Sequence, residues 1–187
     1  MPQRQTHRLR LGRHSAPGAT YFVTTCTHRR LPLFAGEPAR FLARQAWLSL
    51  AELGDVEWLA VAVMPDHVHA LFTLGARLTV SQTLGKAKGT ITRTLGRSPA
   101  TVWQENAFEH RLRDGEECEA YGFYAFMNPY VAGLSSMDGP WPGWACSDDA
   151  RLHFLAGRTM AGAPAPEWLD RARVPDPRLV VRCPDHR

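Results

Sequence analysis

Residues 56–74 of this chain read VEWLAVAVMPDHVHALFTL and predict a β-hairpin. Two runs rich in β-branched and aromatic residues, 56–63 and 67–74, favour extended strands. Met64-Pro65-Asp66 separates them, and such a triplet favours a tight turn. We therefore expect two antiparallel strands joined directly.

The second strand of this hairpin carries His67-Val68-His69. Side chains alternate along a strand, so the two histidines share one face of the sheet and Val68 points to the other. Two neighbouring imidazoles can bind one divalent cation. Alternatively, both are ordinary half-buried strand residues, because two ligands do not make a site.

The segments around the hairpin alternate between strand and helix patterns. Asp114 is expected to cap the third helix, Pro129 to kink or end it, and Ser98–Gln104 to form a connection. The expected elements are a strand at 20–27, a helix at 37–53, a helix at 79–95, a strand at 107–113 and a helix at 116–134.

The resulting order, β-α-β-β-α-β-α, predicts an α+β fold: a ferredoxin-like or RRM-like antiparallel sheet with helices on one face. An irregular C-terminal extension follows. We divide the chain into a basic N-terminal arm (1–18), a principal domain (19–134), a loop-rich extension (135–157) and a Pro- and Arg-rich tail (158–187) that we expect to be extended or partly disordered.

Length and composition indicate one globular domain with appendages. The chain has 187 residues, of which 44% are hydrophobic. No apolar run approaches the length of a transmembrane helix, and residues 1–8 do not resemble a signal peptide. We expect a cytoplasmic, nucleoid-associated protein with no membrane partner.

Charge is distributed unevenly along the chain, whose net charge is +4. No acidic residue precedes Glu37, and residues 75–113 are strongly basic, whereas residues 114–149 contain acids and no Lys or Arg. Basic segments of this kind are typical of proteins that bind a polyanion. Solvated surface charge is the alternative explanation.

The third predicted helix offers a nucleophile and a further ligand. Tyr124 and Asn128 are four residues apart and share a helix face. The Asn128 amide oxygen with two imidazoles would form a mixed N/O set acceptable to Mg²⁺ or Mn²⁺. Phenol, with a reference pKa of ~10, needs help to attack a phosphodiester. Tyrosines on helices are also common packing residues, as Tyr121 and Tyr130 illustrate.

Three motifs together resemble one protein family. Met64-Pro65-Asp66-His67-Val68-His69 resembles the histidine–hydrophobic–histidine (HUH) motif of single-tyrosine, IS200-like transposases. The later motifs resemble the branch called REP-associated tyrosine transposases, and the similarity covers about residues 19–134. These later motifs are residues 102–113 (VWQENAFEHRLR), Tyr124-(three residues)-Asn128-Pro129, and Ala132-Gly133-Leu134.

The resemblance implies a fold and a reaction. The implied fold matches the predicted element order. His67 and His69 would be metal ligands, Asn128 would complete the metal site, and Tyr124 would form a 5′-phosphotyrosine. The implied reaction cleaves and rejoins single-stranded DNA beside a hairpin formed by a repetitive extragenic palindrome. Exchange of one phosphodiester for another needs no nucleotide cofactor, and the chain has no Gly-rich phosphate loop.

The chain departs from the family pattern at several positions. Asp66 stands where the family often has Asn, and it could add charge near the metal or serve the turn. Tyr130-Val131 replaces an aliphatic residue and Arg, and Ala125-Phe126 replaces isoleucine and a polar residue. None of these changes removes a catalytic group.

Basic and aromatic side chains are candidates for DNA contacts. Trp141 and Trp144 could stack on bases or could instead hold their Pro-rich loop against the core. The basic candidates are Lys86, Lys88, Arg93, Arg111 and Arg113.

Other functions fit parts of this pattern. A domesticated transposase could bind palindromic DNA without cleaving it. A rolling-circle initiator or relaxase shares the histidine pair and the tyrosine, but such proteins are commonly fused to a helicase, and no Walker-type motif occurs here. A simple H-x-H metal hydrolase would form no covalent intermediate. The sequence leaves open whether the protein is a monomer or a homodimer.

Overall fold

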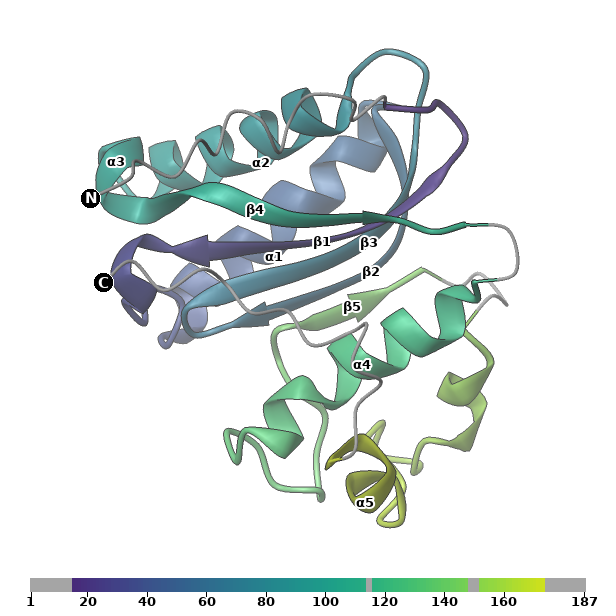
Figure 1. Ribbon diagram of the computed structural model, residues 1–187. Coiled ribbons are helices and arrows are strands. Elements are labelled where there is room, and N and C mark those ends of the chain that lie inside the picture. Colours follow the sequence, from purple (N-terminus) through teal and green to yellow (C-terminus); the bar gives the residue numbers. More distant parts are fainter. Residues whose placement is uncertain (1–14, 114–115, 148–151, 174–187) are drawn as a thin grey trace, which may run out of the picture.

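The structure is a computed structural model that describes residues 15–113, 116–147 and 152–173 (Figure 1). An antiparallel sheet separates two layers of helices. The strands are β1 (Thr20–Thr27), β2 (Val56–Met64), β3 (His67–Leu74), β4 (Trp103–Arg111) and β5 (Trp144–Cys146). The helices are η2 (His28–Arg30), α1 (Glu37–Glu52), α2 (Val80–Thr94), α3 (Pro99–Val102), α4 (Cys118–Val131), η3 (His153–Gly157) and α5 (Trp168–Arg173).

The sheet has the strand order β4-β1-β3-β2-β5, and every neighbouring pair is antiparallel. The predicted α+β class, the antiparallel sheet and the order β-α-β-β-α-β-α are confirmed. β1 and β3 have the predicted bounds, and α2 is capped by Thr79 in a reciprocal capping box with Gln82.

The β2–β3 hairpin lies at the centre of the fold. Its two-residue connection is Pro65-Asp66, and Met64 pairs with His67 directly after the turn. The register places Val68 in the core beneath α1 and α2, while His67 and His69 lie on the other face. The predicted alternation across this strand is therefore confirmed.

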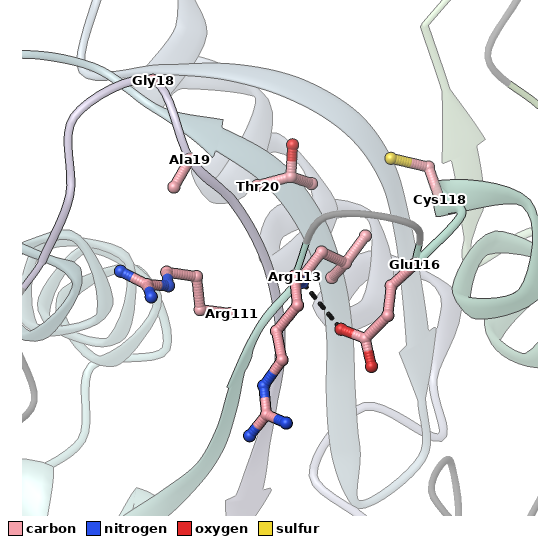
Figure 2. A pocket seen from close by; sticks show the side chains of 8 residues that line it. Gly18, Ala19, Thr20, Arg111, Arg113, Glu116 and Cys118 are labelled. Atoms are coloured by element: carbon pink, nitrogen blue, oxygen red, sulfur yellow. Dashed lines mark hydrogen bonds between the residues drawn. The ribbon is translucent and has the colours of Figure 1, made fainter.

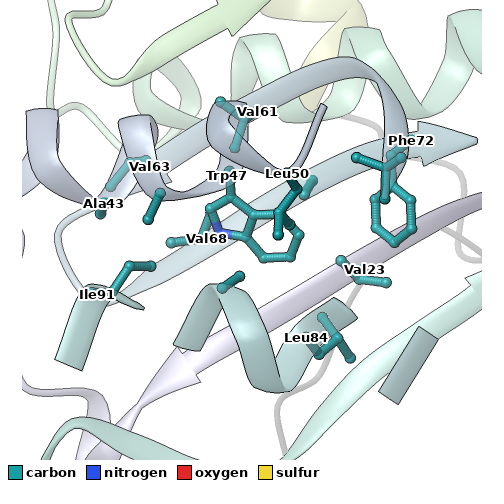
Figure 3. Packing of buried hydrophobic residues seen from close by; sticks show 14 of the residues in the cluster. Val23, Ala43, Trp47, Leu50, Val61, Val63, Val68, Phe72, Leu84 and Ile91 are labelled. Carbon is teal, nitrogen blue, oxygen red and sulfur yellow. The ribbon is translucent and has the colours of Figure 1, made fainter. Parts of the chain in front are cut away.

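One face of the sheet packs against α1 and α2 (Figure 3). Trp47 of α1 lies over the middle of this layer and contacts Phe72 of β3 at a ring-centroid distance of 6.2 Å. Val61, Val63 and Val68 supply the branched surface beneath it. Burial of such side chains contributes about 1.5–3 kcal/mol each, so this layer is a principal source of stability.

The prediction that the helices pack on one face is wrong for α4, which lies on the opposite face (Figure 1). Phe22 of β1 and Leu71 of β3 meet Tyr121 and Phe126 of α4 in a second core. A helix with buried residues on several sides must pack against other elements on more than one side. The sheet provides one cover for α4, and the C-terminal segment provides the other.

The C-terminal segment is more ordered than the sequence predicted. Residues 144–146, expected within a loop-rich stretch, form β5 and pair with β2. Within the stretch expected to be an irregular tail, α5 packs Trp168 against Phe123 of α4 at a ring-centroid distance of 5.6 Å. Phe154 of η3 contacts the same Phe123 at 5.5 Å. Residues 174–187 and 1–14 lie outside the described residues.

The bounds of β4 and α4 also differ from those predicted, and the segment expected to be a connection contains α3. β4 begins at Trp103 rather than residue 107, because its first residues continue the pairing with β1 after an irregularity near Thr25 and Thr27. α4 begins at Cys118, with Glu117 at its N-cap, and the expected cap Asp114 lies outside the described residues. Pro129 sits inside α4, two residues before its end.

A buried carboxylate ties α2 to the loop before β2. The Asp55 side chain is only 2% exposed and pairs with Arg77 at 2.6 Å and with the Nζ of Lys86. The hydrogen bond from Lys86, which outweighs the effect of burial, holds the pKa of Asp55 below its ordinary value of 3.8. Lys86 therefore has a structural partner on its own face of the sheet.

Replacing Asp55 with Asn should lower the free energy of unfolding at neutral pH by about 1–3 kcal/mol, since a hydrogen bond to a charged group contributes about that much. Partial exposure of both cations favours the lower end. The pKa of Asp55 is depressed in the folded state, so its contribution is present above the unfolded-state pKa and is lost as pH falls through the folded-state value. Urea denaturation of wild type and variant should therefore converge only at acidic pH. Glu52→Gln, at an exposed acid nearby, is the control, and an equal loss there would contradict the assignment.

Among the described residues, no helix combines the length and apolar character needed to cross a membrane.

Candidate functional site

The histidine pair forms the centre of the candidate site. His67 and His69 are 8% and 1% exposed, and their Nε2 atoms lie 3.0 Å apart on the α4 face of the sheet. The rings meet edge to face at a centroid distance of 4.6 Å. The two imidazoles therefore converge on one point.

Each imidazole is held through its other nitrogen. The Asp66 carboxylate accepts a hydrogen bond from Nδ1 of His67 at 2.6 Å. Nδ1 of His69 lies 2.8 Å from the hydroxyl of Thr24, its direct partner across the β1–β3 pairing. Such outer partners fix ring orientation and tautomer in metal-binding histidines. With Nδ1 of His67 donating to Asp66, its Nε2 keeps a lone pair directed at the point of convergence.

Both imidazoles favour the neutral form. Burial lowers the pKa of His67, although the Asp66 carboxylate opposes this effect. Burial, with a smaller contribution from the charge of His67, lowers the pKa of His69 well below 6.5. Neutral imidazole is the form that binds metal ions, so the lowered pKa values of both rings suit a metal site.

α4 presents only two partly open side chains along its central stretch. Tyr124 and Asn128 are half-buried, and every other residue between 121 and 130 is buried. The two lie one helical turn apart on the same face, as predicted. The sequence motif therefore coincides with the open side of an otherwise buried helix.

The structure brings Tyr124 to the histidine pair. Its ring lies 5.4 Å from that of His69, at an interplanar angle of 70°. Phe22 of β1 touches both: it stacks on His69 at 5.6 Å and meets Tyr124 edge-on at 6.1 Å. Phe22 thus forms an apolar wall shared by Tyr124 and His69. Asn128 follows one turn later on the same face of α4.

The donor set suits a divalent cation. The Nε2 atoms are hydrogen-bonded to each other at 3.0 Å, and two ligands about 2.1 Å from one ion are separated by about the same distance. Within the described part of the chain, no group of three or more His, Cys, Asp or Glu side chains could hold a metal ion. A third protein ligand would therefore have to be another residue type, and the amide oxygen of Asn128 is of a suitable kind.

The basic residues of α2 lie on the opposite face of the sheet from the histidines (Figure 1). Lys86 pairs with Asp55, and Nζ of Lys88 donates to the backbone oxygen of Gln104 at 3.2 Å. DNA contacts predicted for these two lysines would have to replace internal partners. Arg93, in the last turn of α2, is exposed.

Arg111 and Arg113 line a pocket of about 430 Å³ at the end of β4 (Figure 2). They extend in different directions, and both are exposed. Glu116, also in the lining, accepts hydrogen bonds from Nε2 of His110 at 2.9 Å and from the backbone of Arg113 at 2.7 Å. The backbone bond and then His110 lower the pKa of Glu116. The remaining lining residues are Gly18, Ala19, Thr20, Leu112 and Cys118.

The other aromatic candidates have structural contacts. Nε1 of Trp141 donates to the backbone oxygen of Val63 at 2.9 Å, and Trp144 meets Phe126 edge-on at 5.2 Å. The Tyr130 hydroxyl accepts from the Trp141 backbone and donates to Gly139, while burial raises its pKa. Of the two alternatives for the tryptophans, attachment of their loop to the core is the one that the contacts support.

Sequence reasoning missed three side chains around the histidines: Phe22, Thr24 and Arg30. The first two reach the site through the register between β1 and β3, and Arg30 reaches Asp66 through a loop. Neither relation follows a local sequence pattern. Alternation along β1, which places Phe22 and Thr24 on one face, was the one available signal.

Known proteins resemble this chain in sequence and in fold. The family model for IS200-like transposases matches residues 15–112. The fold is similar to a solved REP-associated tyrosine transposase bound to a REP hairpin, with 22% identity, a TM-score of 0.63, and coverage of 82% of this chain and 89% of that chain. A putative transposase from Deinococcus radiodurans is 19% identical with a TM-score of 0.46, covering 67% of this chain and 97% of that chain. No curated protein matches the chain. Because the family match spans more than half of the 187 residues, the protein belongs to the IS200-like transposase family.

Proposed function

We propose that this protein cleaves and rejoins single-stranded or hairpin DNA through a 5′-phosphotyrosine intermediate on Tyr124, and that the reaction depends on Mg²⁺ or Mn²⁺. The observation that carries the proposal is the position of Tyr124, whose ring lies 5.4 Å from His69 in the histidine pair. Membership of the IS200-like family supports a transposase-like role in DNA processing. The hairpin in the similar solved structure supports palindromic DNA as the substrate class.

Tyr124 is the proposed nucleophile. Its oxygen would attack the scissile phosphorus, form the 5′-phosphotyrosine and release a 3′-hydroxyl. A 3′-hydroxyl would later attack the same phosphorus and release the tyrosine. One phosphodiester replaces another at each step, so no nucleotide cofactor is required.

His67, His69 and Asn128 are the proposed metal ligands. A divalent ion bound by them would neutralise negative charge on the phosphodiester and so assist a weakly nucleophilic phenol. Thr24 and Asp66 hold the two imidazoles in place. Phe22 keeps one side of the site apolar, which limits access of water to the phosphotyrosine.

The proposal is tested by a covalent-adduct assay. The full chain is incubated with a labelled DNA hairpin carrying single-stranded flanks, with Mg²⁺, with Mn²⁺ or with a chelator, and is then separated on a denaturing gel. We expect a protein–DNA band that requires the metal. Cleavage without such a band would indicate a hydrolase, and binding without cleavage would indicate a non-catalytic DNA-binding protein.

Arg111 and Arg113 are the proposed phosphate contacts nearest α4. Replacing either with Ala should weaken hairpin binding and should reduce the slope of log affinity against log salt by about 1, as expected for one lost phosphate contact. Fluorescence anisotropy over a range of salt concentrations measures both. Arg173→Ala, at an exposed position on α5, should change neither. An unaltered slope in both the Arg111 and the Arg113 variant would exclude these arginines as phosphate contacts.

A further inference from the structure

The loop after β1 has an unfavourable backbone conformation beside the candidate site. Arg29 and Arg30 have φ angles of 52° and 57°, in the left-handed region. This region is disfavoured for residues with a Cβ atom, and such residues persist only where surrounding contacts impose the conformation. Two consecutive examples indicate that surrounding contacts hold this loop in a fixed position.

The loop is fixed to the turn that precedes the histidines. The backbone nitrogen and the hydroxyl of Thr27 both donate to the backbone oxygen of Asp66, each at 2.9 Å. The backbone nitrogen of Phe34 donates to the oxygen of Pro65 at 2.8 Å. These three bonds bracket Arg30 and set its distance from Asp66.

Arg30 completes a chain of contacts that ends at the histidine pair. Its Nε lies 2.8 Å from Oδ2 of Asp66, and its Nη1 donates to Sγ of Cys26 at 3.0 Å. The other oxygen of Asp66 binds Nδ1 of His67 at 2.6 Å. The carboxylate therefore bridges the guanidinium and the imidazole, with one oxygen for each.

Stability alone does not account for this arrangement. The Arg30 side chain is 41% exposed, and an ion pair this open to solvent contributes little to folding. The conformation at Arg29 and Arg30 is unfavourable in itself. The arrangement orients Asp66 and holds the Arg30 guanidinium against Sγ of the disulfide-bonded Cys26.

We propose that Arg30 is a positioning residue for the metal site and acts through Asp66. By occupying Oδ2, Arg30 holds the carboxylate so that Oδ1 fixes the ring and tautomer of His67 with Nε2 directed toward His69. It also keeps Asp66 as a partner of His67 rather than a metal ligand. This inference rests on the metal site of the proposed function.

The test compares Arg30→Ala with Arg29→Ala in the full chain. Both positions are exposed and left-handed, and alanine keeps the Cβ, so the backbone strain is matched. The Mn²⁺ dissociation constant is measured by electron paramagnetic resonance without DNA. We expect Arg30→Ala to weaken binding about 10-fold or more, as for loss of other outer partners of metal ligands, and Arg29→Ala to match wild type.

A double-mutant cycle separates positioning from a general structural effect. If Arg30 acts through Asp66, Arg30→Ala should add no further loss of Mn²⁺ affinity to Asp66→Ala. Nitrogen-15 NMR of the metal-free protein should show a smaller fraction of the Nδ1–H tautomer of His67 in Arg30→Ala. Arg30→Gln, with thermal unfolding measured alongside, provides the same comparison if the alanine variant folds poorly.

Three results would overturn the inference: unchanged Mn²⁺ affinity in Arg30→Ala, additive losses in the cycle, or tighter binding, which would make Asp66 a direct ligand. Failure of the proposed metal site gives a different result, because the wild type itself would then not bind Mn²⁺. The adduct assay, which does not vary Arg30, tests the reaction separately.

Discussion

Tyr124→Phe is expected to abolish the covalent protein–DNA adduct, with a loss of at least about 1000-fold, as for removal of other catalytic nucleophiles. Phenylalanine keeps the ring that contacts His69 and Phe22 but lacks the attacking oxygen. Hairpin binding should change by less than about 5-fold, the range expected when a surface contact contributes under 1 kcal/mol. Adduct yield on a denaturing gel and anisotropy of the labelled hairpin measure the two effects.

Two tyrosines on the same helix serve as controls. Tyr130 is held by Trp141 and Gly139, and Tyr121 is buried against Phe22. Phenylalanine at either position should leave the adduct in place, with an effect on stability only. A persistent adduct in Tyr124→Phe that disappears in Tyr121→Phe would move the nucleophile by one helical turn and refute the assignment to Tyr124.

His67→Ala should weaken Mn²⁺ binding by more than about 100-fold, because loss of a direct ligand should exceed the 10–100-fold typical of outer partners. The adduct should disappear with it at moderate Mn²⁺ concentrations. His67 is slightly more exposed than His69, so its replacement disturbs the core less. Isothermal titration calorimetry with Mn²⁺ measures the loss.

His153→Ala is the matched control for this variant. His153 begins η3 and is exposed. Its removal should leave Mn²⁺ affinity unchanged. Retention of wild-type affinity in His67→Ala would show that the histidine pair is not the metal site, even if Tyr124 remained essential.

The parts of the fold that follow local patterns were predictable from sequence. The β2–β3 hairpin follows from two β-rich runs around Met64-Pro65-Asp66, and α2 follows from the cap at Thr79. The side of the sheet that α4 covers was not predictable from element order. The clue lay in α4 itself: almost every residue from 121 to 130 is apolar, which indicates cover on several sides.

β5 shows a different limit of sequence reasoning. It has only three residues, and it exists because Trp144–Cys146 meets β2, more than 80 positions earlier in the chain. A pairing so short and so distant leaves no periodic pattern.

Some residues of the candidate site could likewise be predicted from local patterns, and others could not. His67, His69, Tyr124 and Asn128 could be identified because their spacings place them on common faces of a strand and a helix. Their supporting groups could not. Thr24 reaches His69 through strand register, and Arg30 reaches Asp66 through a left-handed loop.

The aromatic contacts of α4 with η3 and α5 make the proposed chemistry dependent on residues that take no part in the reaction. Phe154 and Trp168 pack against Phe123, and the next residue, Tyr124, contacts His69. The family match ends at residue 112, before any of these four aromatic residues. A mutation in the C-terminal segment could therefore inactivate the protein while the sheet and both histidines stay intact. During divergence, this segment and α4 would have to change together.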